Sequence, residues 1–230
     1  MRKFLWPVLV ILAGCAVPPR EEAPPAAAVP AAPAAAQSAV PGESWKVVAS
    51  TLEVRVYRDG PMQKLGHNHL ITSDQLTGEI VLRKPVTATS FELSLPLESL
   101  VVDDEKARAA AGGDFAAPVP AKDAAGTRQN MLGEKLLNAA SFGVMTLASE
   151  SFSGEPGNYQ AQVRVSLAGG EHVVAAPFTV TIEGDEMKAH SEFHLKHSEV
   201  GLVPMTVALG AVKVRDDFEV SVTLAARRGS

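Results

Sequence analysis

Strict alternation of apolar and polar residues is the pattern that most limits the folds open to this chain. In the stretch 159–167, apolar residues stand at every second position and mostly polar residues stand between them, as a strand with one buried face requires. Gly169-Gly170 marks a tight turn into a second such stretch, 172–182, and Gly184-Asp185 marks a turn into a third, 187–195. The sequence therefore predicts three consecutive antiparallel strands.

The same alternation returns at 91–97 and at 218–224, and each stretch predicts a strand with one solvated face. Weaker strand patterns cover 45–58, 65–82 with a break at Ser73-Asp74, and 142–152. About eight antiparallel strands must pair as a sandwich or close into a barrel, and closure would remove exposed edges and enclose room for one small ligand. Alternation alone leaves both open, with a slight preference for the barrel.

One helical pattern interrupts the strands. Residues 127–138 carry apolar side chains at helical spacing, contain no proline, and begin with Thr127 as a candidate cap. The preceding segment, 103–126, is rich in Ala, Gly and Asp and is expected to be an exposed excursion with partial helix. The adjacent acids Asp103-Asp104-Glu105 are interpreted as solvated surface charge.

The N-terminus has the layout of a secretory signal. Arg2 and Lys3 precede an apolar run, 4–13, that is too short to span a bilayer, which needs about 20 residues. The segment resembles a bacterial lipoprotein signal, which implies cleavage after residues 1–14 and acylation of Cys15, the only cysteine in the sequence. An ordinary secretory signal with an incidental cysteine is the alternative. By resemblance to the lipoprotein sorting rule, Ala16 favours the outer membrane, facing the periplasm.

Residues 15–43 are then expected to form a lipidated Pro/Ala-rich tether, since Ala and Pro dominate and no apolar periodicity could bury a face. Residues 44–228 are long enough for one domain with its own core. A formal net charge of -5 and the lack of a basic cluster argue against nucleic acid as a partner. Oligomeric state is left open by the sequence.

Four motifs occur in a recognisable order: Leu65-Gly66-His67-Asn68-His69-Leu70, the segment 128–142 (RQNMLGEKLLNAASF), Leu167-Ala168-Gly169-Gly170, and 197–202 (HSEVGL). In this order they resemble the YceI-like family of bacterial periplasmic proteins. The resemblance spans about 44–226. It implies an all-β fold: an extended eight-stranded antiparallel lipocalin-like β-barrel, with the short helix near 127–138 inserted, that takes up an isoprenoid or similar long amphiphile without catalysis.

The chain departs from the family pattern at three places. Asn68 stands where the family usually has Asp, and Gly143 stands where it usually has Pro. His197 and Glu199-Val200 replace residues that are often Arg and Asp-Phe. These differences leave the expected fold unchanged and make the identity of the ligand a separate question.

His67 and His69 lie two positions apart, so on an extended strand their rings would face the same side. Three interpretations stay open: structural hydrogen bonding at a turn, contact with a ligand headgroup together with Asn68, and metal binding, which would make the chain a metal-binding envelope protein or an enzyme. A metal site would need further ligands from the other histidines. Of these, His190 and His194 fall on the polar side of their strand and are expected outside the barrel.

The inward-facing apolar side chains are the remaining candidates for ligand contact, and they would form a smooth lining if the barrel closes around a cavity rather than a packed core. The candidate lining residues are Leu93, Leu95, Val163, Val165, Phe178, Val180, Phe193, Phe218 and Val220. No nucleophile elbow and no glycine-rich phosphate loop occurs in the sequence, so no catalytic residue and no cofactor is predicted.

Overall fold

A computed structural model describes residues 41–155 and 157–229. Cys15, the predicted signal and most of the predicted tether therefore lie outside the described residues. The strands are β1 (Gly42–Asp59), β2 (His69–Ser73), β3 (Thr77–Arg83), β4 (Ser90–Pro96), β5 (Val101–Val102), β6 (Val144–Glu155), β7 (Asn158–Leu167), β8 (Gly170–Glu183), β9 (Glu186–Lys196), β10 (Thr206–Val207) and β11 (Val212–Arg228). The helices are α1 (Glu105–Ala111), α2 (Ala121–Leu132) and the short 3-10 helices η1 (Gln63–Leu65), η2 (Val86–Ala88), η3 (Leu97–Ser99), η4 (Gly113–Phe115), η5 (His197–Val200) and η6 (Ala208–Gly210).

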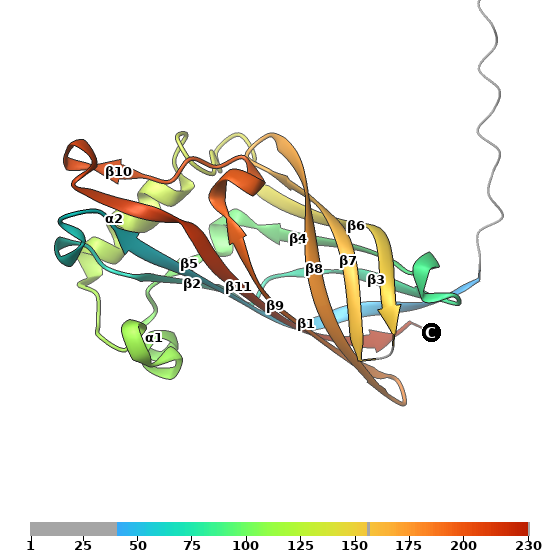
Figure 1. Ribbon diagram of the computed structural model, residues 1–230. Coiled ribbons are helices and arrows are strands. Elements are labelled where there is room, and N and C mark those ends of the chain that lie inside the picture. The colour runs from blue at the N-terminus through green and yellow to red at the C-terminus, as the bar shows by residue number, and fades with distance from the viewer. Residues whose placement is uncertain (1–40, 156, 230) are drawn as a thin grey trace, which may run out of the picture. The chain divides into compact units, whose positions relative to one another are not determined.

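The long strands close into an antiparallel barrel, which settles the choice between barrel and sandwich (Figure 1). Going round the ring, the order is β1-β11-β9-β8-β7-β6-β4-β3, and β3 pairs again with β1. The closing pair is the longest, running from Trp45 opposite Arg228 to Asp59 opposite Lys213. The described residues thus confirm the predicted eight-stranded barrel, with the short strands β2, β5 and β10 as additions outside this ring.

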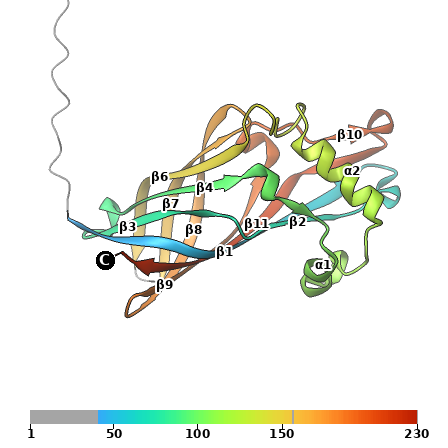
Figure 2. The same cartoon turned by 180° about the vertical axis from the view of Figure 1, so that it is seen from behind.

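The barrel wall is less complete at one end. On the edge of β1 that faces away from β11, residues 42–46 pair with β3 and residues 52–56 pair with β2. The other edge of β2 pairs with β5 alone, through Ile71 and Thr72. Helix α2 contacts β5. It lies at this end of the barrel (Figure 2). We call it the α2 end; the opposite end contains the start of β1 and the end of β11.

The predicted alternation is confirmed in burial. In β7, Ala161, Val163 and Val165 are buried, whereas Gln162 and Arg164 between them are exposed. The loop between β7 and β8 consists of two residues with positive φ, Ala168 at 51° and Gly169 at 80°, the conformation that matches the twist of a hairpin. Local pattern and turn chemistry therefore set which face of the sheet lies inside.

The predicted helix is displaced from its true position. Helix α2 begins at Ala121, six positions before the expected start, and ends at Leu132, so Thr127 lies inside it and is not its cap. Pro120 directly precedes the first turn, where a proline is compatible with a helix, and alanines with good helix propensity follow. Gly133 then ends the helix, and the rest of the expected range forms turns. Helix α1 lies in the expected excursion.

Side chains fill the end of the barrel opposite α2. Trp45 is fully buried there and lies opposite Ile80 on β3. Met187 on β9 and Ala226 on β11, which lie opposite each other, are buried in the same core. The guanidinium of Arg228 lies 4.9 Å from the centre of the Trp45 ring. This end is therefore a packed core. Among the described residues, no helix has both the length and the apolar character needed to cross a bilayer.

Candidate functional site

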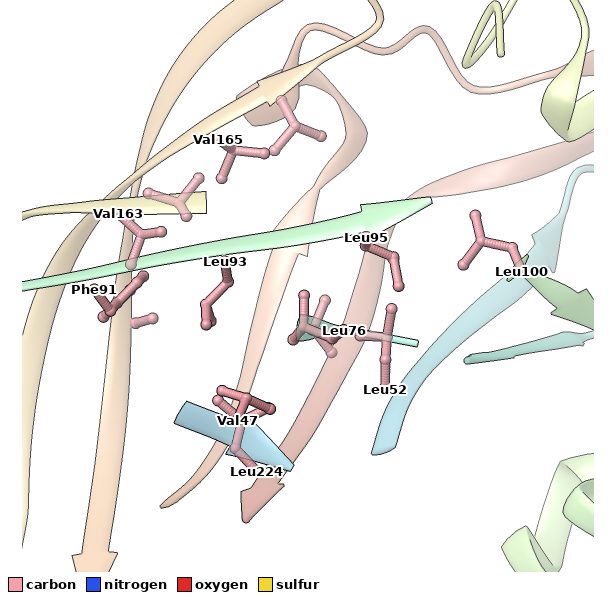
Figure 3. Packing of buried hydrophobic residues seen from close by; sticks show 14 of the residues in the cluster. Val47, Leu52, Leu76, Phe91, Leu93, Leu95, Leu100, Val163, Val165 and Leu224 are labelled. Carbon is pink, nitrogen blue, oxygen red and sulfur yellow. The ribbon is translucent and has the colours of Figure 1, made fainter. Parts of the chain in front are cut away.

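An apolar cavity of about 230 Å³ occupies the barrel interior between this packed core and the α2 end. Inward-facing side chains from the barrel strands form its wall (Figure 3). Nearly all of the residues predicted to line such a space do so: Leu93, Leu95, Val163, Val165, Phe178, Phe193, Phe218 and Val220. Val180 is the exception, because it packs against the core and does not line the cavity.

The end of helix α2 and the turns after it complete the wall at the α2 end. Met131, at the end of α2, is buried, and it lines the cavity together with Leu136 and Leu137 from the turns that follow. Leu97 and Leu100, around η3, close the same side. This part of the wall is built from turns and a helix end rather than from strands hydrogen-bonded on both sides, so it is the part that can move at least cost.

Two polar side chains, Ser191 and His197, lie in the described wall of the cavity. Ser191 is 3% exposed and its Oγ has no hydrogen-bond partner among the described residues. His197 is also buried, its ring lies against that of Phe218 at 4.7 Å between centres with the planes tilted by 56°, and its Nδ1 donates to the carbonyl oxygen of Asp216 at 2.8 Å. That bond leaves Nε2 as the acceptor of the neutral ring. The otherwise apolar wall thus carries a hydroxyl and an imidazole.

A second polar cluster lies outside the cavity, beside α2. His69 Nδ1 lies 2.6 Å from Oδ2 of Asp103, and Oδ1 of the same carboxylate accepts from the backbone N–H of Leu70 at 2.9 Å and from Arg108 at 2.6 Å. Arg108, 3% exposed, also donates to the carbonyl oxygen of Asn68 at 2.8 Å. The cluster ties β2 to α1 and to the loop before it.

The prediction that Asp103 is a solvated surface acid is wrong. Its side chain is fully buried, and its backbone adopts the left-handed conformation at φ 57°. Burial by itself raises the pKa of Asp103, but the hydrogen bonds from His69 and Leu70, the charge of the His69 ring and the hydrogen bond from Arg108 outweigh it and hold the pKa below its ordinary value. Three adjacent acids are typical of a solvated turn, so nothing in the local sequence separates Asp103 from its neighbours.

His67 and His69 both face helix α2. His67 Nε2 lies 3.6 Å from Oδ2 of Asp123, and His69 Nε2 lies 3.4 Å from the hydroxyl of Thr127, one turn further along the helix. The two rings are 6.2 Å apart. His67, Asn68 and His69 do not line the cavity, and their contacts are those of a junction between β2 and α2.

No group of three or more His, Cys, Asp or Glu side chains is placed to hold a metal ion within 41–155 and 157–229. The further ligands that a metal site at His67 and His69 would need are not gathered there: His190 and His194 are exposed on β9, as predicted, and His197 lies at the cavity. The described geometry therefore gives the metal interpretation no support beyond the two rings themselves.

A closed eight-stranded antiparallel barrel around an apolar cavity is the architecture of a lipocalin-like binding protein. The sequence of residues 45–226 matches the family model described as the YceI-like domain, so the chain belongs to the YceI-like family, as its motifs predicted. A search of curated proteins gave no match.

Two solved structures share this fold. BcnA from Burkholderia cenocepacia superposes with a TM-score of 0.54 at 12% identity, over 76% of this chain and 95% of that one. A structure described as a polyisoprenoid binding domain from Saccharophagus degradans, implicated in plant cell wall breakdown, gives 0.51 at 12% identity, over 80% of this chain and 98% of that one. The superpositions establish the common fold, and at identities this low they establish nothing more. The ligand of this chain must therefore be inferred from its own residues.

Proposed function

We propose that this protein binds a long amphiphilic lipid of the isoprenoid type in its barrel and stores or carries it without chemical change. The observation that carries the proposal is the cavity wall, which is aliphatic or aromatic except at Ser191 and His197. Burying an apolar chain against such a wall yields about 25 cal/mol per Å² of apolar surface, minus the cost of ordering the ligand. The polyisoprenoid binding described for the Saccharophagus degradans domain supports the same ligand class.

The size of the cavity bears on how such a ligand enters. About 230 Å³ is slightly below the roughly 300 Å³ at which pockets for drug-sized molecules begin. A long chain therefore requires part of the wall to move. Met131, Leu136 and Leu137 are the natural candidates, because they belong to the helix end and turns rather than to the closed ring of strands. We place the ligand entrance at the α2 end on this ground.

Two polar groups in the wall suit an amphiphile better than a pure hydrocarbon. A ligand hydroxyl could donate to Nε2 of His197, and a ligand carbonyl or hydroxyl could pair with the free hydroxyl of Ser191 after rotation of its side chain. A buried hydroxyl without a partner is unfavourable in the empty barrel. Such pairing would orient the ligand, whereas the affinity would come from its length.

The placement in the cell is also a proposal. The signal-like residues 1–14, Cys15 and the Pro/Ala-rich segment to residue 43 support a lipid-anchored protein of the bacterial cell envelope, tethered to the outer membrane and facing the periplasm. Several acyl chains on Cys15 would give stable anchoring. An anchor and tether would keep the barrel near a reservoir of the amphiphiles that its cavity suits.

Titration with an isoprenoid quinone tests the function directly. We expect the quinone to co-elute with the protein in gel filtration and to saturate near one molecule per chain. A chain that stays free of quinone at every concentration, while its circular dichroism shows a folded barrel, would contradict the proposal.

A further inference from the structure

Exposed apolar side chains gather on two loops at the α2 end. Met62 and Leu65, 49% and 70% exposed, lie in the loop between β1 and β2, and Leu209 lies fully exposed in the loop between β10 and β11. Both loops project from the same end of the barrel in the two views (Figures 1 and 2). We call Met62, Leu65 and Leu209 the apolar tip.

The two loops of the apolar tip are joined to each other. The backbone N–H of Met62 donates to the carbonyl oxygen of Ala211 at 2.9 Å, across the two loops. Gly60 allows this approach, because a Cβ at that position would lie 2.7 Å from the same oxygen. Three large apolar side chains are thus presented to solvent on one connected support rather than on independent loops.

Leu209 is held in an unfavourable conformation without any gain in burial. Its φ and ψ are 55° and 33°, the left-handed region that a leucine rarely occupies. Packing against the barrel does not explain this, since the side chain is fully exposed. A strained backbone that points an apolar side chain into water indicates a surface that is completed by something outside the chain.

The charged residues around the apolar tip indicate which kind of partner it would bind. The segments 58–67 and 203–215 contain four basic residues, Arg58, Lys64, Lys213 and Arg215, and one acidic residue, Asp59, which pairs with Lys213 at 3.1 Å. Asp216 and Asp217 follow directly, and the whole chain has a formal net charge of -5. Lys64, Lys213 and Arg215 are exposed. Large apolar side chains flanked by basic ones fit the surface of an anionic bilayer, where the former enter the acyl region and the latter meet the headgroups.

The apolar tip also lies beside the proposed entrance. Leu202 lines the cavity, and the next residue, Val203, is 76% exposed on the chain that leads to β10 and the tip. A lipid leaving a bilayer at the tip would therefore meet apolar side chains up to the cavity wall. The part of the predicted tether that precedes β1, 15–41, would span about 80 Å at roughly 3 Å per residue, longer than the roughly 60 Å length of β1, so it would not prevent this contact.

We propose that the apolar tip docks the barrel on anionic phospholipid bilayers, independently of any lipid attached to Cys15. The partner is the bilayer surface itself, and the contact is made by Met62, Leu65 and Leu209 together with the surrounding basic side chains. This inference does not depend on what the cavity holds, and docking with an empty barrel remains fully consistent with it.

Vesicle flotation tests the proposal with the chain from Ala16 onward, which lacks the predicted lipidation site and keeps every described residue. The wild-type chain should float with vesicles of phosphatidylglycerol and phosphatidylethanolamine and bind phosphatidylcholine vesicles weakly. Leu65→Gln combined with Leu209→Asn should weaken binding by roughly tenfold or more, because the inserted apolar area is lost. Asparagine tolerates the left-handed backbone at position 209, so the fold should be retained.

A matched control removes two exposed apolar side chains from the opposite end of the barrel. Val48→Gln with Ile182→Gln should leave vesicle binding within about twofold of wild type, since these positions, 56% and 42% exposed, lie away from the tip. Lys64→Glu should weaken binding at low salt, and Lys188→Glu on the outer face of β9 should not.

Three results would overturn the proposal. The first is no flotation of the wild-type chain, and the second is an equal loss of vesicle binding in the tip and control variants. The third is a chain that does not bind vesicles but forms a dimer at high concentration, seen as a doubled mass in light scattering that the tip substitutions abolish. The last result would assign the tip to a second copy of the chain. Melting curves by circular dichroism verify that each variant is folded, and quinone binding on the same samples separates failure of docking from failure of the lipid-binding function.

Discussion

His69 and Asp103 are 34 positions apart in the sequence, and Nδ1 of the one lies 2.6 Å from Oδ2 of the other. The contact fixes the start of β2 against the residue that follows β5, on the side where the barrel wall is least complete. Because Arg108 and the Leu70 N–H share the same carboxylate, one buried charge organises β2, the entry to α1 and the support of α2. We therefore interpret the histidine motif as a structural junction that shapes the α2 end.

Replacing Asp103 by Asn removes the charge and keeps a residue that tolerates the left-handed backbone. Arg108 would then be buried without its counterion, so we expect a loss of about 3–5 kcal/mol in the free energy of unfolding, measured by urea denaturation. Asp104→Asn is the matched control: Asp104 is exposed and caps α1 through Ala107 N at 2.9 Å, and Asn caps a helix about as well. Equal effects of the two changes would contradict the assignment.

The pKa of Asp103 makes a pH prediction with a definite sign. Its pKa in the folded chain is lowered, so the ionised form is favoured by folding, and its stabilisation is present above the unfolded pKa of about 3.9. That stabilisation is lost as the pH falls below about 4. We expect the free energy of unfolding to drop over this range in the wild type and to drop less in Asp103→Asn. Parallel curves for the two proteins would show that other carboxylates dominate.

The cavity makes a prediction in which a single strand supplies both variant and control. Val163→Phe places a larger ring in the cavity and should reduce quinone binding at least about tenfold, at a cost in stability of about 1–3 kcal/mol. Gln162→Phe puts the same ring on the exposed face of β7 and should leave binding unchanged. If both variants bind quinone like the wild type, the ligand does not occupy this cavity.

Cys15 makes a prediction outside the described residues. Cells expressing the wild-type chain should incorporate labelled palmitate into the protein, and Cys15→Ala should incorporate none while keeping the fold and lipid binding of the barrel. The variant should also leave the membrane fraction under high salt, which weakens electrostatic docking. Continued labelling of Cys15→Ala, or firm membrane attachment in high salt, would refute the lipoprotein interpretation.

Much of the fold could be predicted because apolar and polar residues alternate along each strand, which shows which face is buried. Val163 and Val165 alternate with Gln162 and Arg164, and the buried set follows directly. What could not be predicted depends on contacts between distant segments. Asp103 differs from Asp104 only because His69 and Arg108, from other segments, contact its carboxylate. No local sequence pattern predicts these contacts.

The cavity could not be predicted from the sequence either. Apolar residues facing inward are required equally by a packed barrel and by a hollow one. This barrel is packed around Trp45 and hollow in the region that Leu93 and Val165 line. The helix was predicted too far along the chain because the apolar residues after Gly133 have helical spacing. In the structure they form turns that close the cavity. Their spacing reflects the shape of the cavity wall and not a helix face.

Mass spectrometry of an organic extract from the purified, folded protein tests the central claim most directly. The account predicts an isoprenoid-type lipid in the extract of the wild-type chain, approaching one molecule per chain after incubation with isoprenoid quinone, and a strongly reduced amount in Val163→Phe. A wild-type extract that contains no such lipid, before or after incubation, would contradict it.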